Sequence, residues 1–132
     1  MKRVAFVCTH NSCRSQMAEA WAKHLGESLI EAYSAGTENY PEVKPLAVKV
    51  MEESGIDMSD QKPKLISEIP QEIDILITMG CGVACPFIPC QHREDWELTD
   101  PSGGPIEEYR KTREIIKEKV IDLLKRIKSD QL

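Results

Sequence analysis

Residues 4–15 read VAFVCTHNSCRS, an apolar run that leads into a polar loop with two cysteines and an arginine. Four consecutive apolar residues are typical of a buried β-strand, and the residues after the loop return to helical spacing. A loop that joins a strand to a helix directs backbone N–H groups toward one point, and the helix N-terminus adds positive potential there. The segment therefore predicts an anion-binding site at the start of the chain.

The side chains of this loop suit a reaction on the bound anion. Arg14 can make a two-pronged contact to a tetrahedral oxyanion, and the same positive field favours the nucleophilic thiolate form of Cys8. Ser15 can donate its hydroxyl to that sulfur. A lone cysteine at a strand end is usually a buried apolar residue, but its combination with arginine and serine favours a catalytic role. The predicted oxyanion-binding segment, called the anion loop below, comprises Thr9, His10, Asn11, Ser12, Cys13 and Arg14.

Two of these loop residues are expected to shape the loop rather than react. Asn11 is expected to hold the loop through side-chain hydrogen bonds, and Cys13 is expected to be structural.

Composition restricts the class of protein. The chain has 132 residues and a formal net charge of −5, which predicts one domain over residues 1–132 and argues against nucleic-acid binding. No apolar stretch approaches membrane-spanning length, and the first strand begins too early to leave room for a cleaved signal. The five cysteines, an odd number, favour reactive or metal-bound thiols over a disulfide framework. We expect a cytoplasmic monomer that binds neither nucleic acid nor a membrane.

Hydrophobic spacing predicts strands that alternate with helices. Helical spacing covers residues 15–25, 45–55 and 106–127. Strand patterns cover residues 4–7, 29–36 and 73–78, with a short turn at 65–69 and a brief strand around 95–97. This alternation predicts an α/β layer sandwich with a mostly parallel sheet, in which ligands bind at the carboxyl ends of the strands.

Three further cysteines follow the third predicted long strand. We expect Cys81, Cys85 and Cys90 at the same edge of the sheet as Cys8. Together with His92 they could ligate zinc, although the paired two-residue gaps typical of zinc knuckles are missing. Alternatively, a mobile loop carries an attacking thiol toward a sulfur that has reacted at the anion loop. We favour thiol chemistry, expect no metal and no cofactor, and leave Cys90 divided between this role and simple packing.

Asp100 completes the predicted site. A carboxylate on a loop that returns to the same sheet edge can act as general acid for an oxygen leaving the anion. The dipeptide Asp100-Pro101 is also a common surface turn. Its position next to the other predicted site residues favours the catalytic interpretation.

These motifs resemble the low-molecular-weight protein tyrosine phosphatases and, within that family, the thioredoxin-coupled arsenate reductases. The segments that carry the resemblance span nearly the whole chain: residues 8–15, 16–19, 33–36, 55–57 and 100–101. The resemblance implies a three-layer sandwich in which a four-stranded parallel sheet is flanked by helices. Phosphatases usually carry tyrosines just after Asp-Pro, where this chain has Ser102-Gly103-Gly104, whereas Cys81 and Cys85 stand where the reductases keep resolving cysteines.

The resemblance implies reduction of arsenate to arsenite and a role in arsenical resistance, with hydrolysis of phosphate monoesters as the alternative. Cys8 would attack arsenic while Asp100 protonates the departing oxygen. Cys81, our first choice, would then attack the Cys8 sulfur, and Cys85 would exchange into that disulfide; the order of these two thiols stays open. The reductant is either thioredoxin or a small thiol such as mycothiol, and phosphate or sulfate is expected to mimic arsenate.

Overall fold

The computed structural model describes residues 1–38, 40–80 and 89–132. In chain order its elements are β1 (Lys2–Cys8), α1 (Arg14–Leu25), β2 (Ile30–Gly36), α2 (Pro45–Glu53), the 3₁₀ turn η1 (Ile66–Glu68), β3 (Ile75–Thr78), β4 (His92–Asp95) and α3 (Ile106–Lys128). The four strands form one parallel sheet in the order β2-β1-β3-β4. The expected alternation of strands and helices is confirmed.

The central strand β1 is buried on both faces. Val4, Phe6 and Cys8 belong to the larger core, and Ala5 and Val7 belong to a second, smaller core on the other side of the sheet. Successive side chains of a strand point to opposite faces, so a strand covered on both sides needs an unbroken apolar run. The run at residues 4–7 is explained by this two-sided burial.

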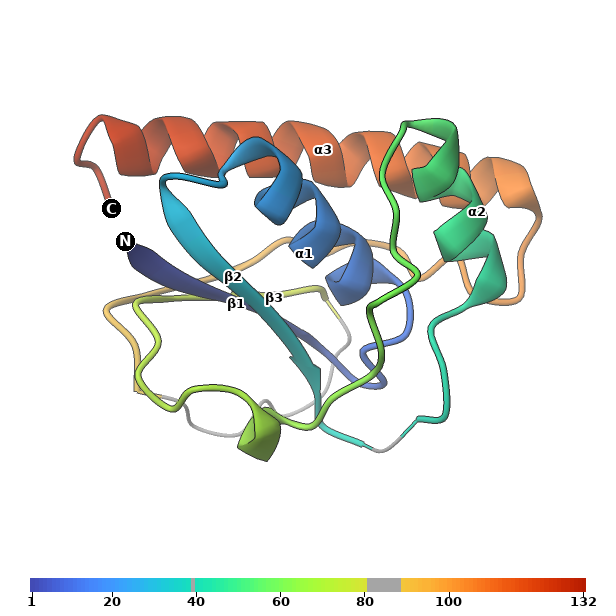
Figure 1. The fold of residues 1–132 in the computed structure, drawn as a ribbon, viewed down its shortest axis with the longest axis horizontal. Helices are drawn as coiled ribbons and strands as arrows, with labels where there is room; N and C mark the ends of the chain where they lie inside the picture. Colours follow the sequence, from blue (N-terminus) through green and yellow to red (C-terminus); the bar gives the residue numbers. More distant parts are fainter. Residues whose placement is uncertain (39, 81–88) are drawn as a thin grey trace.

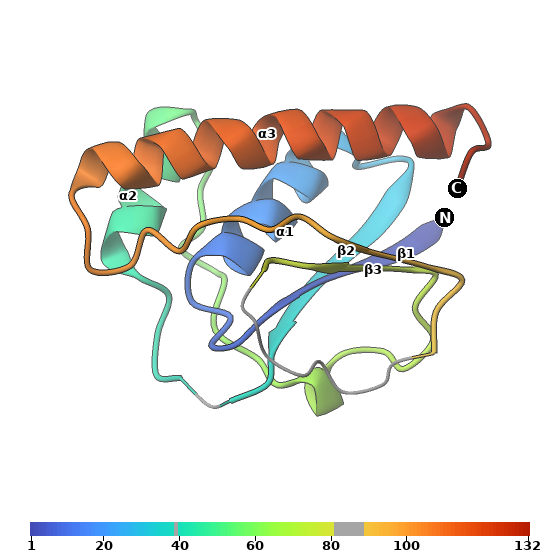
Figure 2. The same ribbon diagram turned by 180° about the vertical axis from the view of Figure 1, so that it is seen from behind.

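The helices gather on one face of the sheet. In Figure 1 and, from behind, in Figure 2, α1, α2 and α3 lie on the same side of the strands, while η1 lies on the other. The long helix α3 contributes a buried stripe at helical spacing, namely Tyr109, Thr112, Ile116, Val120, Leu123 and Ile127. The layers are thus the helices, the sheet, and η1 with its flanking loop over the smaller core. The predicted three-layer fold around a four-stranded parallel sheet is confirmed.

The last strand differs from its predicted position. β4 covers His92–Asp95 rather than residues 95–97, and it pairs with β3 from His92 beside Ile75 to Asp95 beside Thr78. The extended backbone ends by Glu97, which has a φ of 47°. Trp96 is buried and packs its ring 5.6 Å from the ring of Phe6. The prediction was wrong because the charged sequence of this edge strand has no apolar alternation, so only pairing with β3 defines it.

Within residues 1–38, 40–80 and 89–132, none of the helices combines the length and the apolar character needed to cross a bilayer.

A carboxylate on β4 fastens this edge strand to α3. Arg126 donates to both oxygens of Glu94, at 2.8 and 3.0 Å, and the indole N–H of Trp96 donates at 2.7 Å. The His92 ring nitrogen lies 2.7 Å from the same carboxylate. The hydrogen bond from Arg126 contributes most to lowering the pKa of Glu94 to about 2. The ionised Glu94 side chain therefore links the edge strand β4 to helix α3.

We expect Glu94→Gln to lower the free energy of unfolding by about 2 kcal/mol at pH 7. The pKa of Glu94 falls from an ordinary 4.5 to about 2 on folding. The carboxylate therefore stabilises the fold above pH 4.5, and this contribution is lost as the pH falls toward 2. In urea unfolding, the free energies of unfolding of the parent and Glu94→Gln should approach each other between pH 4.5 and about 2. The control Glu114→Gln, which removes an exposed carboxylate paired with Arg113, should cost about 0.5 kcal/mol or less. If the difference in unfolding free energy between the parent and Glu94→Gln stayed constant down to pH 3, the ionised carboxylate would not be its source.

Candidate active site

The anion loop turns sharply between β1 and α1. Its sharpest point is Asn11, which is fully buried and has a φ of 56°, a left-handed conformation that asparagine tolerates better than most residues. The end of β2 passes directly beneath, where a Cβ added at Gly36 would lie 2.7 Å from the carbonyl oxygen of Thr9. The backbone N–H groups of Thr37 and Glu38 donate to that same carbonyl at 2.9 Å. The loop is thus held in place by the strand beside it.

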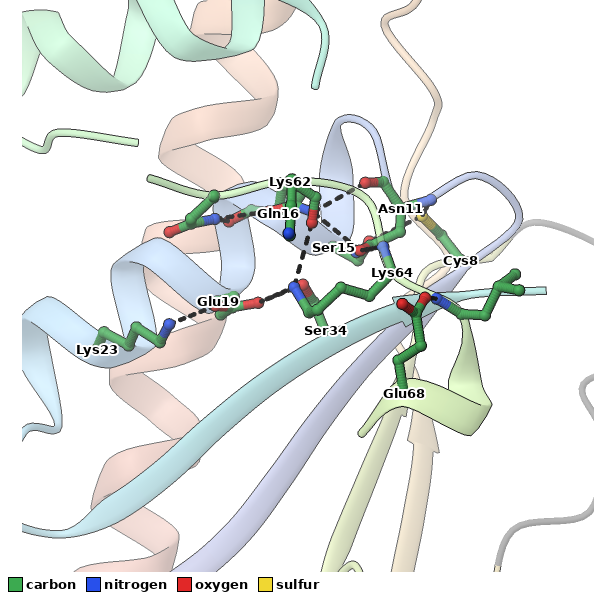
Figure 3. A network of polar contacts seen from close by, with 12 residues as sticks. Cys8, Asn11, Ser15, Gln16, Glu19, Lys23, Ser34, Lys62, Lys64 and Glu68 are labelled. Carbon is green, nitrogen blue, oxygen red and sulfur yellow. Dashed lines mark hydrogen bonds and ion pairs between the residues drawn. The ribbon is translucent and has the colours of Figure 1, made fainter. Parts of the chain in front are cut away.

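The sulfur of Cys8 lies at the carboxyl end of β1 and is nearly buried. The hydroxyl oxygen of Ser15 lies 2.9 Å from it, and the backbone N–H of Asn11 donates to it at 3.3 Å. The side-chain amide of Asn11 donates to the same Ser15 oxygen at 2.7 Å, as Figure 3 shows. Because that oxygen already accepts from Asn11, the Ser15 hydroxyl hydrogen is available to the sulfur. The Cys8 sulfur thus has the Ser15 hydroxyl and the Asn11 backbone N–H as its two hydrogen-bond partners.

Arg14, the first residue of α1, is buried and fixed by backbone carbonyls. Its Nη1 donates to the carbonyl of Met79 at 2.7 Å and to that of Leu98 at 2.8 Å. Its Nη2 lies 3.8 Å from the carboxylate of Asp100. Among the described residues, Nε and Nη2 are thus the guanidinium donors left for a bound anion. The two carbonyls restrain the guanidinium in this orientation.

Asp100 lies at the rim of the same site with its side chain about half exposed. One of its oxygens accepts the backbone N–H of Ser102 at 3.0 Å. Burial raises the pKa of Asp100, but the hydrogen bonds from Ser102 and the charges of Arg14 and Lys44 outweigh it, so the pKa lies below its ordinary value. In the unliganded site Asp100 is therefore a carboxylate.

A cavity of about 810 Å³ brings these groups together. Cys8, Arg14 and Asp100 all line it, as do Thr9, His10, Ser12 and Cys13 of the anion loop. Burial raises the pKa of the Cys13 thiol to about 12, so this cysteine stays protonated. The structure thus brings the predicted nucleophile, anion-binding arginine and general acid into one cavity.

Two residues of this cavity were missed from the sequence. Tyr40 stacks on the ring of His10 with centroids 4.8 Å apart, and Lys44 donates to the Tyr40 hydroxyl at 2.6 Å. The backbone N–H of Lys44 also donates to Ser12, which fastens the start of α2 to the anion loop. Only Pro45, as a helix-opening residue, hinted that Lys44 stands at a helix start.

The second group of thiols is only partly described. Cys81 and Cys85 lie outside the described residues. Cys90 precedes β4, whose first residue His92 pairs with the first residue of β3, Ile75. Cys90 therefore lies at the amino end of the strands, opposite to Cys8 at the carboxyl end of β1. The expectation that Cys90 shares the edge of Cys8 was wrong, because a parallel strand begins only after the chain has returned across the sheet.

Of the four residues proposed for zinc, the structure describes Cys90 and His92. Cys90 is partly buried against the smaller core, and His92 contacts Glu94. Among the residues that the structure describes, no three His, Cys, Asp or Glu side chains form a group that could hold a metal ion. Because Cys81 and Cys85 are outside this range, the four-ligand alternative is not tested.

Comparison with known proteins identifies the family. The family model described as low molecular weight phosphotyrosine protein phosphatase matches residues 3–132. The chain belongs to this family. In this member of the family, Cys8, Arg14 and Asp100 line one cavity.

Two similar proteins over most of the chain are named arsenate reductases. The glutaredoxin arsenate reductase of Synechocystis sp. (strain ATCC 27184 / PCC 6803 / Kazusa) is 44% identical and covers 96% of this chain and 99% of its own length. An arsenate reductase of Staphylococcus aureus (strain Newman) is 40% identical, covering 88% of this chain and 91% of its own.

Solved structures of the family superpose closely. An arsenate reductase in the phosphate binding state has a TM-score of 0.89 at 44% identity, covering 96% of this chain and 99% of its own. The thioredoxin-dependent arsenate reductase of Corynebacterium glutamicum has a TM-score of 0.81 at 34% identity, covering 98% of this chain and 63% of its own. Family membership and fold therefore agree.

Proposed function

We propose that this chain reduces arsenate to arsenite. The observation that carries the proposal is the placing of Cys8, Arg14 and Asp100 around one cavity, in a chain 40–44% identical to named arsenate reductases over most of its length. The cavity lies where the resemblance expects an oxyanion to bind. A tetrahedral oxyanion is therefore the proposed substrate, with phosphate or sulfate as mimics.

In the first step arsenate enters the anion loop, where backbone N–H groups and Arg14 hold its oxygens. The thiolate of Cys8 attacks arsenic, forming an S–As bond as one As–O bond breaks. Asp100 protonates the departing oxygen, which leaves as water. The unliganded carboxylate is ionised, but a bound anion beside it opposes Arg14 and raises the pKa of Asp100 toward the protonated form. Anion binding thus prepares the general acid.

In the second step a resolving thiol attacks the Cys8 sulfur. The S–As bond breaks and its electron pair stays on arsenic, which becomes arsenite. Cys81 is the first choice for this attack, leaving a Cys8–Cys81 disulfide, and Cys85 exchanges into that bond to carry it to the reductant. Both residues lie outside the described residues, so these roles rest on the sequence and on the reductase resemblance.

The electrons come from an external dithiol or thiol. We propose thioredoxin, with a small thiol as the alternative, because relatives include a thioredoxin-dependent reductase and one named for glutaredoxin. A cycle that passes through free thiols needs a reducing compartment, so we place the protein in the cytoplasm.

Hydrolysis of phosphate monoesters is the second candidate. It is favoured by the phosphatase family model and by the phosphate-bound relative. Attack by Cys8 and protonation by Asp100 are the same in both reactions. Water then releases phosphate from Cys8, and no second thiol is needed.

A single-turnover experiment tests the proposal. Reduced protein is mixed with arsenate without any reductant, its free thiols are alkylated, and the disulfides are located by mass spectrometry. We expect about one arsenite per chain and a disulfide that joins Cys8 to Cys81 or Cys81 to Cys85. Absence of both arsenite and disulfide, with hydrolysis of a phosphate monoester by the same sample, would favour the phosphatase.

A further inference from the structure

A buried carboxylate lies behind the anion loop. Glu19 stands on α1, and its side chain is only 4% exposed. It accepts a hydrogen bond from the hydroxyl of Ser34 and pairs with the ammonium groups of Lys23 and Lys64. Figure 3 shows these groups on the α1 side of β2. A buried charge is costly unless it is paired, so Glu19 needs at least one of the two lysines.

The two lysines differ in what else they hold. Lys23 lies one turn further along α1, and its side chain is 55% exposed. Lys64 comes from the segment before η1, its side chain is 24% exposed, and its ammonium lies 3.4 Å from Glu19. The same ammonium donates to the carbonyl of Lys62 at 3.3 Å. Lys64 therefore ties its own segment to the carboxylate, whereas Lys23 pairs within one helix.

The segment that carries Lys64 supports the reactive sulfur. The backbone N–H of Lys64 donates to the side-chain oxygen of Asn11 at 3.0 Å, and the backbone N–H of Gly36 donates to the Lys64 carbonyl at 2.7 Å. The amide nitrogen of Asn11 donates to Ser15, which contacts Cys8. The side-chain amide of Gln16 donates to the same Asn11 oxygen at 2.8 Å and to the carbonyl of Lys62 at 2.9 Å. The orientation of the Asn11 amide, and with it the Ser15 donor on Cys8, thus depends on Gln16 and on where Lys64 holds its segment.

We propose that Lys64 is a positioning residue whose ammonium is a fixed counter-cation for Glu19. It keeps residues 62–64 against Asn11, so that Asn11 and Ser15 keep their donors on the Cys8 sulfur. The proposal rests on the proposed function only in taking Cys8 as the reactive thiol. Arsenate reduction itself is not required.

A second cavity lets an added ammonium ion replace the Lys64 ammonium in a shortened variant. A space of about 470 Å³, separate from the site that contains Cys8, is lined by Glu19, Lys23 and Lys64. A small ammonium ion can therefore reach Glu19 once the Lys64 side chain is shortened. A bulky quaternary ammonium ion carries the same charge but cannot donate a hydrogen bond to the carboxylate.

The test measures alkylation of Cys8 by iodoacetamide across pH, followed on its own peptide by mass spectrometry. In Lys64→Met we expect the reaction at pH 7 to slow about tenfold and its pH profile to move to higher pH, the effect of weakening one hydrogen bond to a charged sulfur. The matched control Lys23→Met, which also removes a cation from Glu19, should stay within about twofold of the parent. Lys64→Arg, which keeps the charge, should also stay close to the parent.

Two further variants separate positioning from a general loss of stability. In Lys64→Ala, methylammonium should restore most of the alkylation rate, whereas tetramethylammonium at the same ionic strength should not. In Glu19→Gln/Lys64→Met no buried carboxylate is left without a counter-cation, so the free energy of unfolding should recover relative to Lys64→Met. Residues 62–64 still lack the link from the Lys64 ammonium to α1, so alkylation of Cys8 should stay slow. Equal slowing in Lys64→Met and Lys23→Met, or an alkylation rate that recovers together with stability in the double variant, would overturn the proposal. Because no step uses arsenate, a failure of the proposed function would leave this result interpretable.

Discussion

Replacement of both Cys81 and Cys85 by serine is expected to abolish multiple-turnover arsenate reduction, with a loss of at least about a thousandfold. Without these two thiols the Cys8–arsenic adduct loses its resolving nucleophiles, because the Cys13 thiol stays protonated and Cys90 lies at the opposite end of the strands. Hydrolysis of a phosphate monoester needs only Cys8, Arg14 and Asp100, so any such turnover should persist. Coupled assays with thioredoxin and its reductase, beside a phosphatase assay on the same sample, measure both activities.

The matched control is Cys90→Ser. Cys90 precedes β4 at the opposite end of the strands from Cys8 and packs against the smaller core. This variant should keep arsenate reduction within about twofold of the parent, since no step requires a thiol there. Reduction by the Cys81→Ser/Cys85→Ser protein at the parent rate would show that the resolving roles are wrongly assigned.

Arg14→Lys is expected to lower kcat/KM for arsenate by about 10²- to 10³-fold. The guanidinium uses Nη1 to hold the carbonyls of Met79 and Leu98 and presents its other donors to the anion. A single ammonium cannot meet two carbonyls and a pair of oxyanion oxygens in one plane. The loss should appear both in turnover and in the affinity for phosphate, measured by calorimetry.

Arg113→Lys is the matched control for stability. Arg113 likewise donates to a backbone carbonyl, that of Val50 at 2.9 Å, and pairs with the carboxylate of Glu53, but it joins α2 to α3. Both variants should lose about 1–2 kcal/mol of unfolding free energy, and only Arg14→Lys should lose oxyanion affinity. Phosphate binding by Arg14→Lys with the parent affinity would contradict the assigned role.

The contacts around Cys8 could be anticipated because they are local. Cys8 and Ser15 are joined by one tight loop between a strand and a helix, and this connection leaves few ways to place the two side chains. The apolar runs of β1 and β3 and the buried face of α3 could likewise be recognised from the spacing of apolar residues in the sequence. Local spacing therefore predicted most of the fold and the contact between Cys8 and Ser15.

Other features depend on residues far apart in the chain. The charged strand β4 exists because it pairs with β3, and the sequence has no periodicity that marks it. The same pairing places Cys90 away from the edge where the order of residues alone suggested it. Tyr40 and Lys44 enter the cavity because the start of α2 is fastened to the anion loop.

The amino-acid order was thus sufficient to predict that Cys8, Arg14 and Ser15 lie together and that the sheet is parallel, since each follows from neighbours within a turn or a strand. Only the folded chain brought Lys64 to Glu19 across 45 positions and placed Tyr40 and Lys44 in the cavity. The physical reason is that a buried charge such as Glu19 is costly unless a cation lies next to it. Whether a distant residue lies there depends on how the helices and strands pack.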